Sequence, residues 1–457
     1  MIADELLREL RSLLGDRLST ANAVREHHSR GESHHEPSLP DAVAFPVATP
    51  EVSAIAALCT RARVPMTPFG AGSSLEGHVV PVRHGLTIDL SRMNRVLRVS
   101  ADDLDCTVEA GVTRKQLDKH LQSTGLFFPL DPGADATIGG MASTRASGTT
   151  AVRYGTMRET VLALTAVLAD GRVIHTGTRA RKSSAGYDLT RLLVGAEGTL
   201  GIITEVTLRL HGRPESIGAA TCWFDTIDEA VAAVITIVQL GIPVARIELL
   251  DDVQMDAINR FSHLSYPVAP TLFFEFHGLS TASVEEHAAA VAEIAAEHGA
   301  HGFSRAISPE ARAVMWQARH DAYYAALALR PGSRGWTTDV CVPISRLAEC
   351  IHETKADLAS SRLVGPLVGH VGDGNFHLVM PVHPEDPADL DEATRITDRL
   401  VERALSMGGT CSGEHGVGLG KMRFLEAEHG AAALDVMRAI KRALDPLDLM
   451  NPGKVLQ

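Results

Sequence analysis

The 457-residue chain has few cysteines, no excess of positive charge and no long hydrophobic run, and each shortage excludes a class of protein. Its six cysteines are scattered and form no C-x-x-C pair, which is typical of free thiols in a reducing compartment rather than of a disulfide-stabilised scaffold. The formal charge of -13 disfavours a nucleic-acid partner and docking on an anionic membrane through a basic patch.

No segment has the pattern of a membrane span or a secretion signal. The most apolar run, residues 230–245, is interrupted by Gly241 and Pro243 and is too short to cross a bilayer. The first residues, "MIADELLRELRSLLG", are amphipathic and acidic, and they lack the basic flank and apolar core of a signal peptide. The sequence therefore predicts a cytoplasmic protein without an integral membrane segment.

The character of the sequence changes near residues 211–216, which predicts a domain boundary in a chain long enough for two cores. Four parts are expected: a helix and a polar segment over 1–35, short strands and glycine turns over 36–213, strand–helix units over 214–415, and a helical segment over 416–457 that packs back on the body.

The polar segment contains four histidines in the run "REHHSRGESHHEP", residues 25–37. Such a run could bind metal, but a solvated N-terminal loop is the commoner explanation.

Two helices of the third part begin with a capping-box pattern. Thr226 with Glu229 opens one of them, and Ser283 with Glu286 opens the other. Each helix follows a predicted strand, which favours an α+β fold with helices packed on an antiparallel sheet. Further helices are expected near 311–328 and 387–407.

The stretch "PFGAGSSLEGH", Pro68–His78, is close to two phosphate-binding motifs and matches neither. His78 stands where a phosphate-loop lysine would be, and the third glycine of a dinucleotide fold is missing. Gly70, Gly72 and Gly77 allow positive φ, so that backbone N–H groups can converge on a phosphate. An ordinary solvent turn explains this loop alone equally well.

Three further stretches rich in glycine and small residues follow, at 131–150, 154–159 and 195–208. Together they favour one extended ligand such as a dinucleotide over unrelated turns. In this order, the four stretches resemble the FAD-binding domain of the vanillyl-alcohol oxidase / p-cresol methylhydroxylase flavoproteins.

The resemblance implies an α+β protein with a two-part FAD-binding domain of the p-cresol methylhydroxylase type and an α+β substrate domain with an antiparallel sheet. It implies that the first loop holds the FAD pyrophosphate. The loop carries serines where some relatives have the histidine that bonds flavin, so we expect non-covalent FAD. The implied FAD-binding residues are Pro68, Gly70, Ala71, Gly72, Ser73, Ser74, Pro132, Gly133, Thr137, Gly139, Gly140, Ser143, Gly148, Tyr154, Glu197, Gly198, Ile203 and Asn451.

A pair of histidines flanks a turn signal in "GHVGDGNFHLVMP", residues 369–381. If Asp373-Gly374 is a two-residue hairpin turn, His370 faces His377 with Cβ atoms about 5 Å apart. Two imidazoles so placed can share a metal ion, and a structural histidine pair is the alternative.

Glu414 and His415 lie side by side in the glycine-rich stretch "CSGEHGVGLGK". Glu414 can supply the anionic third ligand and His415 a general base, unless the stretch is only an acidic surface loop. With the histidine pair they resemble the metal-dependent FAD-linked 2-hydroxyacid dehydrogenases. The resemblance implies His370, His377 and Glu414 as ligands of Zn²⁺, Mn²⁺ or Fe²⁺, and His415 as the catalytic base.

Substrate recognition is expected from a helix arginine. Arg319 follows Trp316 by three residues in "MWQARHDAYYAAL", and the resemblance implies that it binds the substrate carboxylate; a surface arginine is the alternative. Thr337 and Val379 stand where the 2-hydroxyglutarate enzymes carry a lysine and an asparagine for a second carboxylate. The favoured substrate is therefore a small D-2-hydroxyacid, D-lactate first, oxidised to pyruvate by hydride transfer to flavin N5.

Other functions stay open at this point. Within the family, the alternatives are D-2-hydroxyglutarate and glycolate dehydrogenases. Outside it, the His/His/Glu set would also suit a metal-dependent hydrolase, and the glycine loops a flavin-binding sensory module. Cytochrome c, an electron-transfer flavoprotein or a quinone could accept the electrons, and a homodimer is one open oligomeric state.

Overall fold

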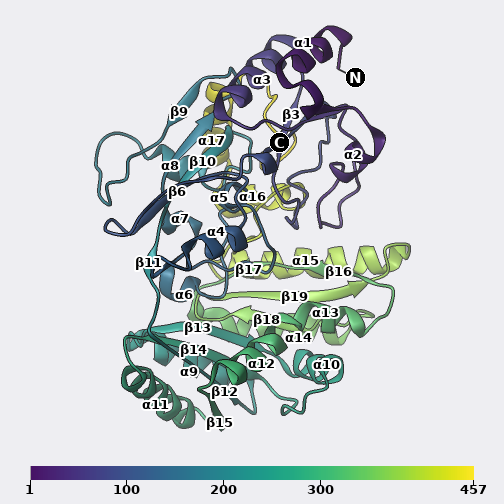
Figure 1. The fold of residues 1–457 in the computed structure, drawn as a ribbon. Coiled ribbons are helices and arrows are strands. Elements are labelled where there is room, and N and C mark those ends of the chain that lie inside the picture. The colour runs from purple at the N-terminus through teal and green to yellow at the C-terminus, as the bar shows by residue number, and fades with distance from the viewer. Residues whose placement is uncertain (1, 457) are drawn as a thin grey trace. The chain divides into compact units, whose positions relative to one another are not determined.

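A computed structural model describes residues 2–456, and its contacts divide the chain into two units. Unit 1 comprises the residues up to Ser147, Gly155–Arg213 and the residues from Glu414 onward, whereas unit 2 comprises Gly148–Tyr154 and Pro214–Gly413. Both described chain ends therefore belong to unit 1 (Figure 1). Within the described part of the chain, no helix combines the length and apolar character needed to cross a bilayer.

Unit 1 contains a four-stranded sheet in the order β1-β2-β4-β3 and a five-stranded antiparallel sheet in the order β5-β6-β10-β8-β9. The strands are β1 (Leu18–Ser19), β2 (Ala42–Ala44), β3 (Met66–Phe69), β4 (Leu86–Asp89), β5 (Val96–Ser100), β6 (Asp105–Glu109), β8 (Val161–Val167), β9 (Val173–His175) and β10 (Ile202–Arg209), with a separate pair formed by β7 (Leu126–Phe127) and β11 (His211–Gly212). The helices are α1 (Asp4–Leu14), α2 (Asn22–His27), α3 (Thr49–Ala62), α4 (Arg114–Leu121), α5 (Ile138–Thr144), α7 (Met157–Thr160), α8 (Leu189–Leu193), α16 (Leu425–His429) and α17 (Ala431–Leu444).

The elements of unit 1 follow from local sequence patterns. On α1, Leu6, Leu10 and Leu14 recur every four residues and are buried, which stabilises the fold by about 1.5–3 kcal/mol per side chain. On β10 buried and half-buried residues alternate from Thr204 onward, as expected for a strand with one covered face. The segment after α17 returns to the four-stranded sheet, where Met450 pairs with Met66.

Unit 2 is built on an antiparallel sheet in the order β15-β12-β14-β13-β18-β19-β16, with β17 also paired to β19 (Figure 1). The strands are β12 (Ser216–Trp223), β13 (Val244–Leu250), β14 (Thr271–Gly278), β15 (His301–Ala306), β16 (Arg334–Thr337), β17 (Val340–Cys341), β18 (Leu367–His370) and β19 (Asn375–Val382). The helices are α6 (Ala151–Tyr154), α9 (Ile227–Gln239), α10 (Asp252–Ser262), α11 (Thr281–Glu297), α12 (Pro309–His320), α13 (Ala322–Ala328), α14 (Leu347–Ala359) and α15 (Pro387–Ser406). The predicted α+β class with an antiparallel sheet is confirmed.

Helices cover both faces of the unit 2 sheet. Phe273 points to the face that packs against Trp316 of α12, whereas its neighbours on β14 point to the opposite face. On that opposite face Gly218 lies so close to Val284 of α11 that a Cβ would clash with it. The central strands of the sheet therefore form a buried layer, whereas the edge strand β15 is largely exposed, and a polar side chain buried in that layer needs a partner.

The predicted capping boxes are half right. Thr226 and Glu229 cap α9 as expected. On α11, however, Ser280 is the N-cap and Ser283 completes the box, so the helix begins earlier than predicted. The Ser283 hydroxyl at the third helical position replaces the expected glutamate by accepting a hydrogen bond from the Ser280 backbone N–H, at 3.3 Å.

The single helix expected near 311–328 is two helices, α12 and α13, which meet at Asp321. The Asp321 carboxylate accepts hydrogen bonds from Ser262 and from Gln317. The sequence pattern did not reveal these contacts of Asp321 to the neighbouring helix α10 and to the last turn of α12, and it therefore predicted one continuous helix.

Candidate functional site

The glycine loop of unit 1 begins where β3 ends. Gly72 and Gly77 have φ of 70° and 74°, as predicted, but Gly70 does not have a positive φ. Gly70 is needed for a different reason, because a Cβ there would clash with the Thr137 hydroxyl. The loop is thus held directly against the start of α5.

Several predicted FAD residues meet around this loop within unit 1. Gly198 packs on Pro68 so closely that a side chain would clash. The Asn451 amide donates to the backbone carbonyls of Glu197, at 2.7 Å, and His78, at 3.0 Å. The structure therefore brings the loop, the 197–198 turn and the C-terminal segment together.

The remaining predicted FAD residues divide between the units. Unit 1 contains Pro132 and Gly133 before α5, Thr137 as its N-cap, Gly139, Gly140 and Ser143 on it, and Ile203 on β10; unit 2 contains Gly148 and Tyr154. The Tyr154 hydroxyl lies 2.8 Å from His277 Nδ1, and the other nitrogen of that ring lies 2.8 Å from Glu275.

The donors of the glycine loop fit an anionic group. Within residues 2–456, the backbone N–H groups from Gly70 to Ser74 donate no hydrogen bond, and the buried Ser74 hydroxyl also has no partner. Native proteins seldom leave such donors unpaired, and converging N–H groups are a common phosphate site. The residues present therefore suit a pyrophosphate.

The histidine-rich N-terminal run is only partly solvated: His27 and His34 are exposed, as expected for a solvated loop, whereas His28 is not. His28 is buried, its Nε2 lies 2.8 Å from Asp89, and its ring packs 4.5 Å from that of Phe69. Three residues later Gly31 touches the Gly72 carbonyl so closely that a Cβ would clash with it. The run folds against the glycine loop.

The histidine hairpin of unit 2 has a different register from the predicted one. His370 pairs with Asn375 and Val368 pairs with His377, so the turn has four residues, Val371–Gly374. A shift of two residues keeps each side chain on the same face. His370 and His377 are consequently diagonal neighbours, with ring centroids 5.4 Å apart and planes at 78°.

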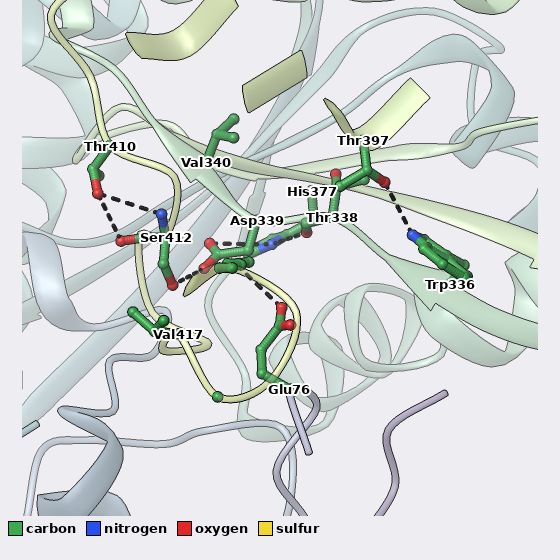
Figure 2. A network of polar contacts seen from close by, with 12 residues as sticks. Glu76, Trp336, Thr338, Asp339, Val340, His377, Thr397, Thr410, Ser412 and Val417 are labelled. Carbon is green, nitrogen blue, oxygen red and sulfur yellow. Dashed lines mark hydrogen bonds and ion pairs between the residues drawn. The ribbon is translucent and has the colours of Figure 1, made fainter. Parts of the chain in front are cut away.

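Both imidazoles are oriented through Nδ1. His370 Nδ1 lies 2.7 Å from Glu248 Oε1. His377 Nδ1 lies 2.9 Å from the Thr338 carbonyl, and Figure 2 shows these two residues. Because both partner oxygens accept, each Nδ1 carries the proton and each neutral ring has its lone pair on Nε2. The two rings offer nitrogens within 4.8 Å of one another. This donor set fits a divalent metal such as zinc, manganese or iron.

Glu248 on β13 also holds the predicted substrate arginine. Arg319 donates from Nε and Nη2 to Glu248 Oε2, at 2.8 and 2.6 Å. Burial raises the pKa of the Glu248 carboxyl, but the charges and hydrogen bonds of His370 and Arg319 outweigh that effect and hold it below the ordinary value. Glu248 was not among the residues predicted from the sequence. The pattern that could have indicated it is a charged residue between apolar residues in a buried strand.

Asp339 is a second residue that the sequence did not reveal. Its buried carboxylate accepts from Asn375 Nδ2 and from the Ser412 hydroxyl, both at 2.8 Å, and lies 3.7 Å from His377 Nδ1. Figure 2 shows Ser412 pointing toward Asp339 from a neighbouring segment. Asp339 thereby ties this segment to the strand that carries His377.

The predicted acid and base follow that segment in the chain. A Cβ on Gly413 would clash with Asn375, so Gly413 lies directly beside the hairpin strand. Glu414 is the next residue, with its Cα about 3.8 Å along the chain. Glu414 and His415 are grouped with unit 1, and their roles as ligand and base stay predictions.

The two positions expected to set substrate size face each other. Thr337 of β16 pairs with Val379 of β19, two residues beyond His377 and on the same face. Trp336 anchors this strand to α15 through a hydrogen bond from Nε1 to the Thr397 hydroxyl, at 3.0 Å (Figure 2). This part of the sheet presents a methyl-bearing hydroxyl and an aliphatic side chain, neither of which carries charge.

Comparison with known proteins identifies both parts of the chain. Residues 40–177 match the FAD binding domain family, and residues 213–455 match the family of FAD linked oxidases, C-terminal domain. The chain is 53% identical to a "Probable D-lactate dehydrogenase, mitochondrial" of Danio rerio, over 99% of this chain and 92% of the relative. It is 46% identical to a "D-lactate dehydrogenase (cytochrome), mitochondrial" of Arabidopsis thaliana, over 100% of this chain and 80% of the relative.

The fold is shared with solved structures of other proteins. The structure of p-cresol methylhydroxylase with substrate bound matches with a TM-score of 0.81 at 16% identity, over 99% of this chain and 96% of that one. A structure of alkyldihydroxyacetonephosphate synthase matches with a TM-score of 0.77 at 22% identity, over 98% and 84% of the two chains.

The relatives also correct the predicted location. The D-lactate dehydrogenases of Danio rerio and Arabidopsis thaliana, which align with nearly the whole chain, are mitochondrial by name. This contradicts a cytoplasmic protein, which was inferred from composition and from the missing signal-peptide pattern.

The sequence motifs, the fold and the comparisons thus indicate the same family. The glycine loop of unit 1, the antiparallel sheet of unit 2 and the full-length matches agree on one group of flavoproteins. The chain belongs to the FAD-linked oxidases of the vanillyl-alcohol oxidase / p-cresol methylhydroxylase superfamily, and within them to the FAD-linked D-lactate dehydrogenases of the cytochrome type.

Proposed function

We propose that the protein oxidises D-lactate to pyruvate with FAD and with one divalent metal bound by His370, His377 and Glu414. The observation that carries the proposal is the full-length match to D-lactate dehydrogenases. The orientation of both imidazoles through Nδ1 supports the metal part.

Bound FAD would supply the acceptor for the hydride of the substrate α-carbon, and a metal held by His370, His377 and Glu414 would supply the charge that lowers the pKa of the substrate hydroxyl group. His415 takes the hydroxyl proton as general base. Arg319 binds the substrate carboxylate through the guanidinium edge that Glu248 leaves uncovered, because its Nη1 donates to no acceptor within residues 2–456. These residues fix the α-carbon and carboxylate, and such positioning supplies a large part of the rate.

The uncharged pair of Thr337 and Val379 supports a small substrate. A second carboxylate placed here would lose its hydration without gaining a cation, which is costly in a buried site. We therefore place D-lactate first, ahead of D-2-hydroxyglutarate, with D-2-hydroxybutyrate as a further substrate.

The decisive experiment is anaerobic bleaching of the flavin absorbance near 450 nm by D-lactate, L-lactate, glycolate and D-2-hydroxyglutarate. We expect D-lactate to bleach the flavin fastest, and a chelator to stop the reaction until metal is returned. A kcat/KM for D-2-hydroxyglutarate above that for D-lactate would overturn the substrate assignment. Undiminished turnover of thoroughly metal-free protein would overturn the role of the metal.

His415→Ala separates catalysis from binding. The variant should retain FAD and metal but lose about 10²–10⁴-fold in kcat, the usual contribution of a general base. A variant that turns over D-lactate at the wild-type rate would exclude His415 as the base.

Two further properties belong to this proposal. The names of the relatives support a cytochrome as electron acceptor, which reduction of cytochrome c by the D-lactate-reduced protein would test. The serines of the glycine loop support non-covalent FAD. Acid precipitation should then release all the flavin into the supernatant, and a yellow pellet would contradict this.

A further inference from the structure

One buried carboxylate lies between the predicted metal ligand and the predicted substrate arginine. The Glu248 side chain is 0% exposed. Its Oε1 accepts from His370, 122 residues away in the chain, and its Oε2 accepts from Arg319, 71 residues away. A buried carboxylate is stable only with such partners, so the three side chains hold one another in place.

We propose that Glu248 is a positioning residue that couples the two halves of the site, so that affinity for metal and affinity for a carboxylate both depend on this one side chain. The inference rests on the proposed function, since it takes His370 as a metal ligand and Arg319 as the carboxylate-binding residue.

The coupling to metal acts through His370. An ionised Glu248 keeps the proton of His370 on Nδ1, fixes the plane of the ring and makes Nε2 a stronger ligand. A glutamine can offer the same position only a weaker, uncharged acceptor. Loss of such an outer carboxylate commonly lowers metal affinity about 10- to 100-fold.

The coupling to substrate acts through Arg319. Both nitrogens that bond Glu248 lie on one edge of the planar guanidinium, so the carboxylate sets the direction of the remaining edge. Without Glu248 the long side chain regains rotational freedom, and a bound carboxylate must fix it again.

The test compares Glu248→Gln with Glu275→Gln in the FAD-loaded protein. Glu275 is the matched control: it is a buried carboxylate on the adjacent strand β14, bonded to His277 instead of His370. Metal affinity is measured by competition between Zn²⁺ or Mn²⁺ and a chromophoric chelator. Carboxylate affinity is measured as the inhibition constant of propionate, which has no hydroxyl group to oxidise.

We expect Glu248→Gln to lower metal affinity about 10- to 100-fold and to weaken propionate inhibition at least about fivefold, while Glu275→Gln changes both less than twofold. A change in only one of the two quantities, or equal losses in the control, would refute the coupling. If wild-type protein binds no stoichiometric metal, the proposed function fails first; if metal binds equally to wild type and Glu248→Gln, only the coupling fails.

A second variant covers the case in which Glu248→Gln does not fold. Arg319→Met leaves Glu248 in place but removes one of its two partners. Coupling through Glu248 then predicts a loss of metal affinity of about threefold or more, although Arg319 is not a ligand. Unchanged metal affinity in Arg319→Met would contradict the proposal.

Discussion

Lys454 offers a quantitative test of the electrostatics of unit 1. Its side chain is buried, with 3% exposed, and Nζ donates to the Val80 carbonyl at 2.6 Å and to Asn451 at 2.9 Å. Burial lowers the pKa of Lys454 from 10.5 to about 7, and the negative charge of Glu197 only partly opposes this. Lys454→Met removes the titrating group and keeps an unbranched apolar stem in its place.

The sign of the pH dependence follows from the depressed pKa. Between pH 7 and pH 10.5 the unfolded chain binds a proton at Lys454 that the folded chain does not bind, so the free energy of unfolding rises with pH. A fall in pKa from 10.5 to about 7 corresponds to about 5 kcal/mol. In the wild type, the free energy of unfolding rises by about half of this 5 kcal/mol between pH 6 and pH 9. In Lys454→Met, this contribution to the rise is absent.

The assay is thermal unfolding of the FAD-loaded protein at pH 6 and at pH 9. The increase in Tm from pH 6 to pH 9 should be larger in the wild type than in Lys454→Met, by about 5–10 °C. Lys119→Met is the control, because Lys119 is an exposed lysine on α4 of the same unit. If the wild type and Lys454→Met show the same pH dependence of Tm, the reasoning on Lys454 is refuted.

Three other predictions concern the site. Gly70→Ala should lower FAD occupancy at least about tenfold, because the new Cβ clashes with the Thr137 hydroxyl. Gly212→Ala is the control, because Gly212 has open space around it, and it should leave FAD occupancy unchanged. The ratio of flavin to protein absorbance measures the occupancy. Asp339→Ala removes the acceptor of two hydrogen bonds and should lower the free energy of unfolding by about 2–5 kcal/mol, as measured by denaturant unfolding. It should also lower metal affinity, as measured by competition with a chelator. Unchanged metal affinity would contradict a role of Asp339 in positioning His377. The double variant Thr337→Lys, Val379→Asn should raise the kcat/KM ratio of D-2-hydroxyglutarate to D-lactate about 10- to 100-fold, and an unchanged ratio would show that this strand pair does not set substrate size.

Patterns that act over a few residues could be predicted from the sequence. The capping box of α9, the alternation on β10 and the placement of His370 and His377 on one face all depend on neighbours along the chain. Even with the wrong turn length, the face was right, because a shift of two residues leaves the side chains on the same side of a strand. The turn itself depended on contacts outside the hairpin: a Cβ at Gly374 would clash with the Val342 carbonyl.

The sequence by itself determined the α+β class, the order of the glycine stretches and the family to which they belong, since these depend on local patterns and residue types. Only the tertiary structure decided that Glu248 joins His370 to Arg319 and that Asp339 joins His377 to the segment before Glu414. These contacts link residues far apart in the chain. No local pattern encodes them, because the pairing of strands and the burial of charge decide which distant side chains meet.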